Sequence, residues 1–169
     1  MKRVFMLLMC LMISCAVFAA SVPVVYLDRS STNLEASSYI KKQAKSNKLP
    51  HKFTFTSDLN SLSGDEKVVV ILNSGLSSGT DPRISSYLNS SQNKQAIILV
   101  NLYSIGKNIL MTSVSSADTA SGVDEISAAT QWKKRDSAIQ AMHEQWTEEL
   151  FRLIQVKQEL WGLSIVLCN

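Results

Sequence analysis

Three short runs of apolar residues constrain the fold of this chain more than any other feature. They cover residues 22–27, 67–72 and 95–100 and consist mainly of valine, isoleucine and leucine. Runs of this length without polar alternation are typical of strands that are buried on both faces of a parallel sheet. Segments with helical patterns separate them, so the sequence predicts a single open α/β sheet, mostly parallel, with helices on both faces.

The segments around these runs add helices and further strands. Phe53 and Phe55 alternate with threonines, which predicts a half-buried strand near an edge of the sheet. Asp81 followed by Pro82 is a typical helix start, and apolar residues beyond 133 recur at spacings of three and four. We therefore expect helices over 34–45, 82–88 and 133–158, and a further strand over 108–114.

The first twenty residues have the pattern of a secretory signal peptide. Lys2 and Arg3 precede an apolar run over 4–18, and small residues follow this run. A membrane span needs roughly 20 apolar residues, so we expect cleavage near Ala20 and export to the periplasm or beyond. Two alternatives are an uncleaved anchor and a lipoprotein lipidated at Cys15. The apolar run continues past Cys15, which favours ordinary cleavage.

Charge and cysteine content exclude several classes of function. The chain has 17 lysines and arginines against 14 aspartates and glutamates, a net charge of +3. Removal of the leader lowers the net charge to +1, which does not favour nucleic acid or anionic lipid as a partner. Cys168 is then the single remaining cysteine, so no internal disulfide is expected. His51 and His143 lack the spacing of metal ligands.

The expected domain covers residues 21–158, and a short apolar tail over 159–169 is too short to span a membrane. In an open α/β sheet, ligands bind at the carboxyl ends of the strands. The loops expected there cover 28–33, 73–81 and 101–107. Their candidate binding residues are Ser30, Ser31, Thr32 and Asn33 in the first loop, Gly75, Ser77 and Gly79 in the second, and Tyr103 in the third.

The first of these loops has the composition of an anion site, because hydroxyl groups accompany the backbone N–H groups of a helix start. The stretch SSTNLE over 30–35 resembles the phosphate loop of flavodoxins. This resemblance implies a flavodoxin-like fold with FMN, whose phosphate would bind the first loop and whose ring would lie against the second loop and Tyr103. The first loop lacks that family's usual glycine, and 73–81 contains no aromatic residue. An envelope module that binds another ligand or a protein, without flavin, is therefore the alternative.

A second local pattern lies at 124–130, where the sequence reads DEISAAT. It resembles the motif of proteins that are flavinylated outside the cytoplasm, in which FMN phosphate is esterified to the threonine. That resemblance implies an electron carrier with covalent FMN on Thr130. The alternative is a loop that leads into the helix near Lys133, with Ser127 or Thr130 as its N-cap.

No constellation of catalytic residues stands out in the sequence. It contains neither a Gly-x-Ser-x-Gly elbow nor a phosphate-binding P-loop. Asp28 and Asp81 follow two of the expected strands, but nothing pairs them as acid and base. His143 adjoins Met142 on the buried side of a helix, which favours a packing role over that of a base. We therefore expect a binding protein or electron carrier, with a small ligand or a redox partner, rather than an enzyme.

Overall fold

A computed structural model describes residues 21–74, 79–103, 122–129 and 137–167. In these residues, the sheet contains five strands, which are β1 (Ser21–Tyr26), β2 (Lys52–Thr56), β3 (Val69–Ser74), β4 (Ile97–Tyr103) and β5 (Asp124–Ala129). The helices are α2 (Ser31–Ser46), α3 (Pro82–Ser90) and α4 (Ser137–Leu167), with short 3₁₀ turns at Leu59–Ser61 and Lys94–Ala96.

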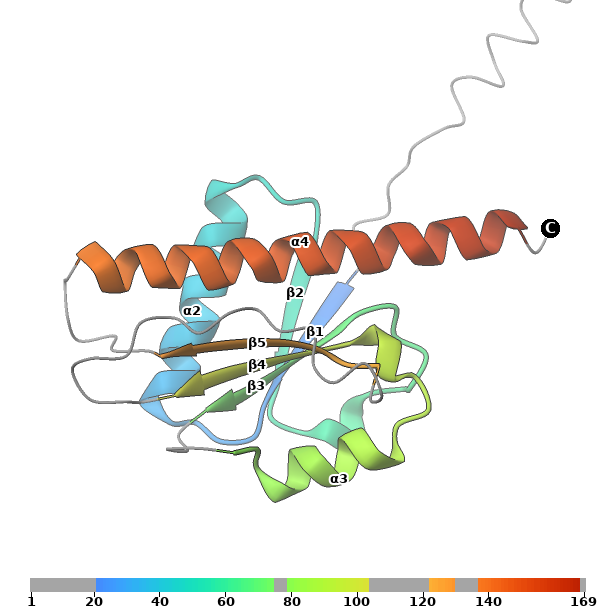
Figure 1. Cartoon of the computed structure of the whole chain (residues 1–169), viewed down its shortest axis with the longest axis horizontal. Coiled ribbons are helices and arrows are strands. Elements are labelled where there is room, and N and C mark those ends of the chain that lie inside the picture. The colour runs from blue at the N-terminus through green and yellow to red at the C-terminus, as the bar shows by residue number, and fades with distance from the viewer. Residues whose placement is uncertain (1–20, 75–78, 104–121, 130–136, 168–169) are drawn as a thin grey trace, which may run out of the picture.

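All strand pairs are parallel, and their order is β2-β1-β3-β4-β5 (Figure 1). This is the flavodoxin-like order of a doubly wound sheet, whose topological switch point lies between β1 and β3. The prediction of an open parallel α/β sheet is confirmed. The prediction that residues 53–55 form a strand near the edge is also confirmed, because β2 is the outermost strand beside β1.

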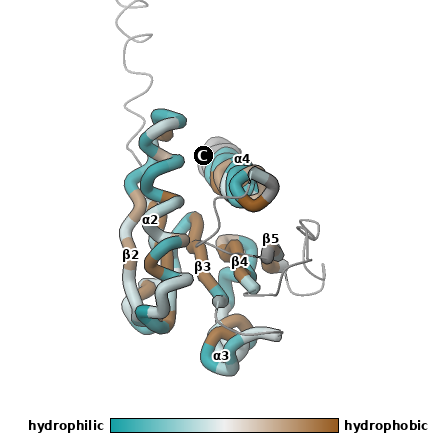
Figure 2. The backbone as a smooth tube through the Cα atoms, turned by 90° about the vertical axis from the view of Figure 1, so that its left-hand side faces the viewer, coloured by the Kyte–Doolittle hydropathy of each residue, from teal (hydrophilic) through white to brown (hydrophobic). Residues whose placement is uncertain are grey.

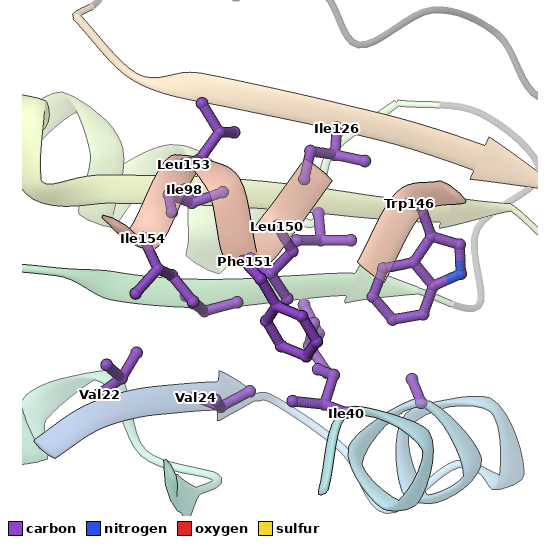
Figure 3. Packing of buried hydrophobic residues seen from close by; sticks show 14 of the residues in the cluster. Val22, Val24, Ile40, Ile98, Ile126, Trp146, Leu150, Phe151, Leu153 and Ile154 are labelled. Atoms are coloured by element: carbon purple, nitrogen blue, oxygen red, sulfur yellow. The ribbon is translucent and has the colours of Figure 1, made fainter. Parts of the chain in front are cut away.

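Helices cover the two faces of the sheet differently. The tube view shows α2 and α4 on one face and α3 on the other (Figure 2). Trp146, Leu150 and Ile154 of α4 are fully buried against Ile98 and Ile126 of the sheet (Figure 3). Burial of an aliphatic side chain such as Leu150 or Ile154 contributes about 1.5–3 kcal/mol. Their spacing of four residues is the pattern that predicted this helix.

The opposite face has a smaller core under α3. Ile84 is 1% exposed and packs with Val25, Ile71 and Leu99 of the three central strands. Leu59, Leu62, Tyr87 and Leu88 are partly buried around this cluster. Since these residues come from α3 and from the 3₁₀ turn after β2, both elements are fixed to the sheet by apolar contacts.

Two sequence interpretations need correction. Residues 124–129 do not form a helix-entry loop with Ser127 as a cap, because they pair with β4 along their whole length as β5. The pairing places Ile126 and Ala128 in the core. The sequence did not indicate this strand, because the segment begins with two charged residues. Helix α4 also continues to Leu167 and includes most of the expected tail, extending past the sheet (Figure 1). The strand expected over 108–114 lies outside the described residues.

No helix in the described ranges combines the length and the apolar character that a membrane crossing requires. Among the described side chains of α4, the large apolar ones that are exposed are Val156, Leu160 and Trp161, and Leu160 is 58% exposed.

Candidate functional site

The first loop of the carboxyl edge is built around Asn33, which is 2% exposed in the first turn of α2. Its side-chain Nδ2 donates to the backbone oxygen of Asp28 at 3.1 Å and to Asp28 Oδ1 at 2.8 Å. Ser74 at the end of β3 donates from Oγ to Asn33 Oδ1 at 2.5 Å. Asn33 therefore connects the loop after β1 to the end of β3, across the topological switch point.

The start of α2 is capped by its own chain. The Ser30 side chain accepts a hydrogen bond from Asn33 N at 3.3 Å, as an N-cap residue does. Ser30 N in turn donates to Asp28 Oδ1 at 2.9 Å. The backbone N–H of Ser30 is the main reason that the pKa of Asp28 lies below its usual value, and the charge of Arg83 adds to the effect. Asp28 is thus ionised at neutral pH beside the helix N-terminus.

The charge of Asp28 disfavours a phosphate beside the start of α2. Asp28 Oδ1 accepts from the backbone N–H of Ser30, the N-cap residue, so a carboxylate lies close to the positive end of α2. A phosphate bound to Ser30, Ser31, Thr32 and Asn33 would lie beside the charge of Asp28, and two anions repel each other at such short range. The side-chain amide of Asn33, moreover, is already bonded to Asp28 and Ser74.

A second polar chain crosses the other face of the sheet. Asn73 and Asn101 are paired in the register of β3 and β4, and both are almost fully buried. Asn73 Nδ2 donates to Asn101 Oδ1 at 2.6 Å and to the backbone oxygen of Gly79 at 3.0 Å. Its Oδ1 accepts from Asp81 N at 3.1 Å. The buried amide therefore anchors the segment that leads into α3.

The same chain continues into β5. Asn101 Nδ2 donates to Glu125 and, at 3.4 Å, to Ser127 Oγ. Burial and the charge of Glu125 raise the pKa of the Tyr103 phenol, while a hydrogen bond with Ser127 opposes this rise. Tyr103 therefore lies at the end of β4 as a neutral, partly buried hydroxyl beside two polar groups of β5.

Charges at this edge are mostly negative or paired. Arg83 forms an ion pair with Asp81, with Nη2 and Oδ2 2.7 Å apart, and this hydrogen-bonded contact lowers the pKa of Asp81. The same guanidinium influences Asp28, so the two aspartates are linked through Arg83 rather than through each other.

A groove of about 510 Å³ adjoins this edge on the α3 face. It lies where β1 and β2 end, between the 3₁₀ turn after β2 and α3. Leu27 and Leu59 supply apolar surface, and the ring of Tyr87 is partly buried beside them. The remaining lining residues are polar: Ser57, Asp58, Asn60, Arg83, Ser86 and Ser90.

The structure brings some of the predicted site residues together and separates others. Ser30 and Asn33 share one hydrogen-bonded cluster, with Ser31 and Thr32 in the adjoining helical turn. Gly79 adopts a φ of +83°, which favours glycine, and its carbonyl accepts from Asn73. Tyr103 belongs to the second polar chain instead. Gly75, Ser77 and Thr130 lie outside the described residues.

Sequence reasoning did not anticipate the part played by Asp28 and Glu125. An aspartate directly after a buried strand was the available signal for Asp28, since this position faces the next helix start. Glu125 gave no such signal, because its neighbour Asn101 is distant in the sequence.

Comparisons with known proteins were made for sequence and for structure. No protein family and no curated protein matches the sequence. Among solved structures, the chain is similar to a flavodoxin from the domain Archaea, at 12% identity and a TM-score of 0.49, covering 82% of this chain and 99% of that one. It is also similar to two-electron reduced Megasphaera elsdenii flavodoxin, at 12% identity and a TM-score of 0.48, covering 75% and 98%. The assignment to the flavodoxin-like fold rests on the strand order and parallel pairing.

Proposed function

We propose that this protein is an exported binding protein without catalytic activity, whose ligand is a small, uncharged, hydroxyl-rich molecule such as a sugar. The observation that carries this proposal is the ionised carboxylate of Asp28 at the start of α2. It disfavours a phosphate at the switch point and leaves the groove beside it as the better candidate.

The chemistry of the groove supports a neutral ligand. Three serine hydroxyls and the Asn60 amide offer both donors and acceptors without a charge. The partly buried ring of Tyr87 beside Leu27 and Leu59 provides an apolar surface for the carbon–hydrogen face of a sugar. The guanidinium of Arg83 is held by Asp81, so it is oriented in advance for hydrogen bonds to hydroxyl groups.

The groove proposal is tested by calorimetric titration with a panel of neutral monosaccharides and disaccharides. Ser86→Trp fills the groove from an exposed position on α3, and we expect it to abolish the binding seen with the unmodified protein. Ser38→Trp is the matched control, because Ser38 is exposed on α2 and away from the groove. If the panel yields no binding, or both variants bind equally well, the groove is not the site.

FMN binding is the competing proposal, and it predicts a different set of results. If the protein binds FMN, protein purified from a flavin-replete host should be coloured or should take up added FMN. Our proposal expects neither, and it expects Asp28→Asn to raise any weak affinity for FMN because a negative charge is removed. Tight binding of FMN to the unmodified protein would contradict the repulsion that we infer.

Covalent flavinylation is the third possibility, since β5 ends at Ala129, directly before Thr130 in the sequence. Colour that stays with acid-precipitated protein and disappears in Thr130→Ala would establish it. The described part of the motif also has a packing role: Asp124 pairs with Lys157, and Ile126 and Ala128 are buried.

Export is part of the same proposal. The composition of the leader over residues 1–20 supports export. N-terminal sequencing of protein recovered from a periplasmic extract should start at Ser21. Recovery of full-length chain from the cytoplasm or the membrane fraction would contradict this part.

A further inference from the structure

Among the described residues, positive charge is concentrated in one short segment. Residues 41–52 contain five lysines and His51, whereas 36–57 contain no aspartate or glutamate. The other described residues have the opposite balance, with 12 carboxylate side chains against 6 lysines and arginines. The described residues therefore show a marked separation of charge.

The fold places this segment at one edge of the molecule. Lys41, Lys42, Lys45 and Lys48 lie on or just after the second half of α2, and Lys52 begins β2. All five side chains are exposed. Figure 2 shows the hydrophilic turns of α2 next to β2, at the side of the sheet. We call these five lysines and His51 the basic edge.

Nothing within the described residues neutralises the basic edge. The ion pairs of the described residues join Arg83 to Asp81, Arg152 to Glu149 and Lys157 to Asp124. None of these pairs includes a lysine of the basic edge. Lys41 instead lies over the ring of Phe55, with its Nζ 4.3 Å from the ring centre. Exposed like charges held close together attract an acidic partner and accelerate its association.

The basic edge also coincides with an unpaired strand. β2 pairs with β1 on one side and has no neighbour on its other side in the described part of the chain. Backbone groups along such an edge can accept a further extended strand. A groove of about 330 Å³ runs beside it, lined by Lys41, Lys45 and His51 together with Ala44, Leu49 and Phe53.

The spacing of the lysines on α2 matches the spacing of side chains along an extended strand. Lys41 and Lys45 are one helical turn apart, about 6 Å along the axis of α2. Every second side chain of an extended segment points the same way, about 6.6 Å from the previous one. We propose that an acidic, extended polypeptide segment binds along β2, with alternate carboxylates facing the lysines of the basic edge and apolar side chains entering the groove.

The test uses fluorescence anisotropy with a short labelled peptide of alternating glutamate and valine. We expect the mature domain to bind this peptide at low salt, and its affinity to fall as salt is added. The counterpart of alternating glutamine and valine should bind at least about tenfold more weakly. A glutamate peptide with N-methylated backbone amides should also lose affinity, because it cannot pair with the edge of β2.

Matched variants locate the surface. Lys41→Glu with Lys45→Glu should weaken peptide binding by about tenfold or more. Lys67→Glu with Lys94→Glu changes the net charge equally, away from α2 and β2, and should leave the affinity within about twofold. Circular dichroism and thermal melting check that both pairs remain folded, as expected for substitutions outside the core.

Several outcomes would overturn the proposal. Equal binding of the glutamate and glutamine peptides excludes recognition by charge. Equal losses in the two lysine pairs, or undiminished binding of the N-methylated peptide, exclude the edge of β2. Failure to bind the peptide, combined with binding to vesicles of anionic phospholipid or to single-stranded DNA, would make the basic edge a surface for a different polyanion. None of these results affects the groove proposed above for the neutral ligand.

Discussion

Asn73 of β3 and Asn101 of β4 lie opposite each other in the sheet and are joined by a hydrogen bond of 2.6 Å between their side chains. They are 2% and 1% exposed, near the carboxyl ends of their strands. Because each amide also bonds to a further segment, this pair holds the start of α3 and the edge strand β5 to the centre of the sheet.

We expect Asn101→Leu to destabilise the protein by about 1–3 kcal/mol, because it leaves the buried Asn73 amide and the Glu125 carboxylate with fewer partners. Urea unfolding followed by circular dichroism measures this loss. The control is Asn60→Leu, an exposed position, which should change the free energy of unfolding by less than about 0.5 kcal/mol. Equal stability of Asn101→Leu and the unmodified protein would mean that the pair contributes no net stability.

The ion pair of Lys157 and Asp124 should respond asymmetrically to substitution. The two charged groups are 2.6 Å apart, but the lysine side chain is 8% exposed and the aspartate side chain 31%. Asp124→Ala leaves a buried ammonium group with the Gln95 carbonyl alone, whereas Lys157→Met leaves a carboxylate that water can reach. We expect Asp124→Ala to cost about 2–4 kcal/mol and Lys157→Met about 1 kcal/mol. The reverse order in equilibrium unfolding would show that the aspartate is the more poorly solvated partner.

His143 should make stability depend on pH in a defined window. It is 5% exposed beside the ring of Tyr39, and burial lowers its pKa from 6.5 to about 4. Below pH 6.5 the unfolded chain binds a proton that the folded chain takes up only near pH 4. The free energy of unfolding should therefore fall by up to about 3 kcal/mol between pH 7 and pH 4.

The variant His143→Gln should flatten this slope, whatever its stability at neutral pH. Burial also lowers the pKa of His51, so His51→Gln is the matched comparison and should flatten the slope less. The carboxyl groups with lowered pKa, including Asp28 and Asp81, lose their contribution at more acidic pH, below about 4. An unchanged slope between pH 6.5 and 5 in His143→Gln would rule out this histidine as the cause.

Helix capping gives a prediction for the segment that leads into α3. Asp81 Oδ1 accepts from Arg83 N at 2.8 Å, and Pro82 occupies the first turn. Asp81→Ala should lower the free energy of unfolding by about 1 kcal/mol. Asp81→Asn keeps an oxygen acceptor and should cost less, although it also loses the ion pair with exposed Arg83. Thermal melts of the two variants are compared at equal pH. A smaller loss in Asp81→Asn than in Asp81→Ala means that capping is the larger effect, and equal losses mean that the charge is.

Much of the fold was predictable because its signals are local. The apolar runs that became β1, β3 and β4 are buried on both faces and need no pairing information to be recognised as strands. The N-caps Ser30 and Asp81 bond to backbone groups only two or three residues away. β5 was missed because its strand character comes from pairing with β4 rather than from its own composition.

The sequence by itself determined the class of this protein: a parallel α/β sheet whose strand ends carry polar loops, preceded by a leader typical of export. Only the tertiary structure decided what these loops hold. Asn33 and Ser74 meet across 41 positions of sequence, and Asn101 meets Glu125 across 24. Hydrogen bonds between distant residues depend on strand order and register, which no local pattern encodes.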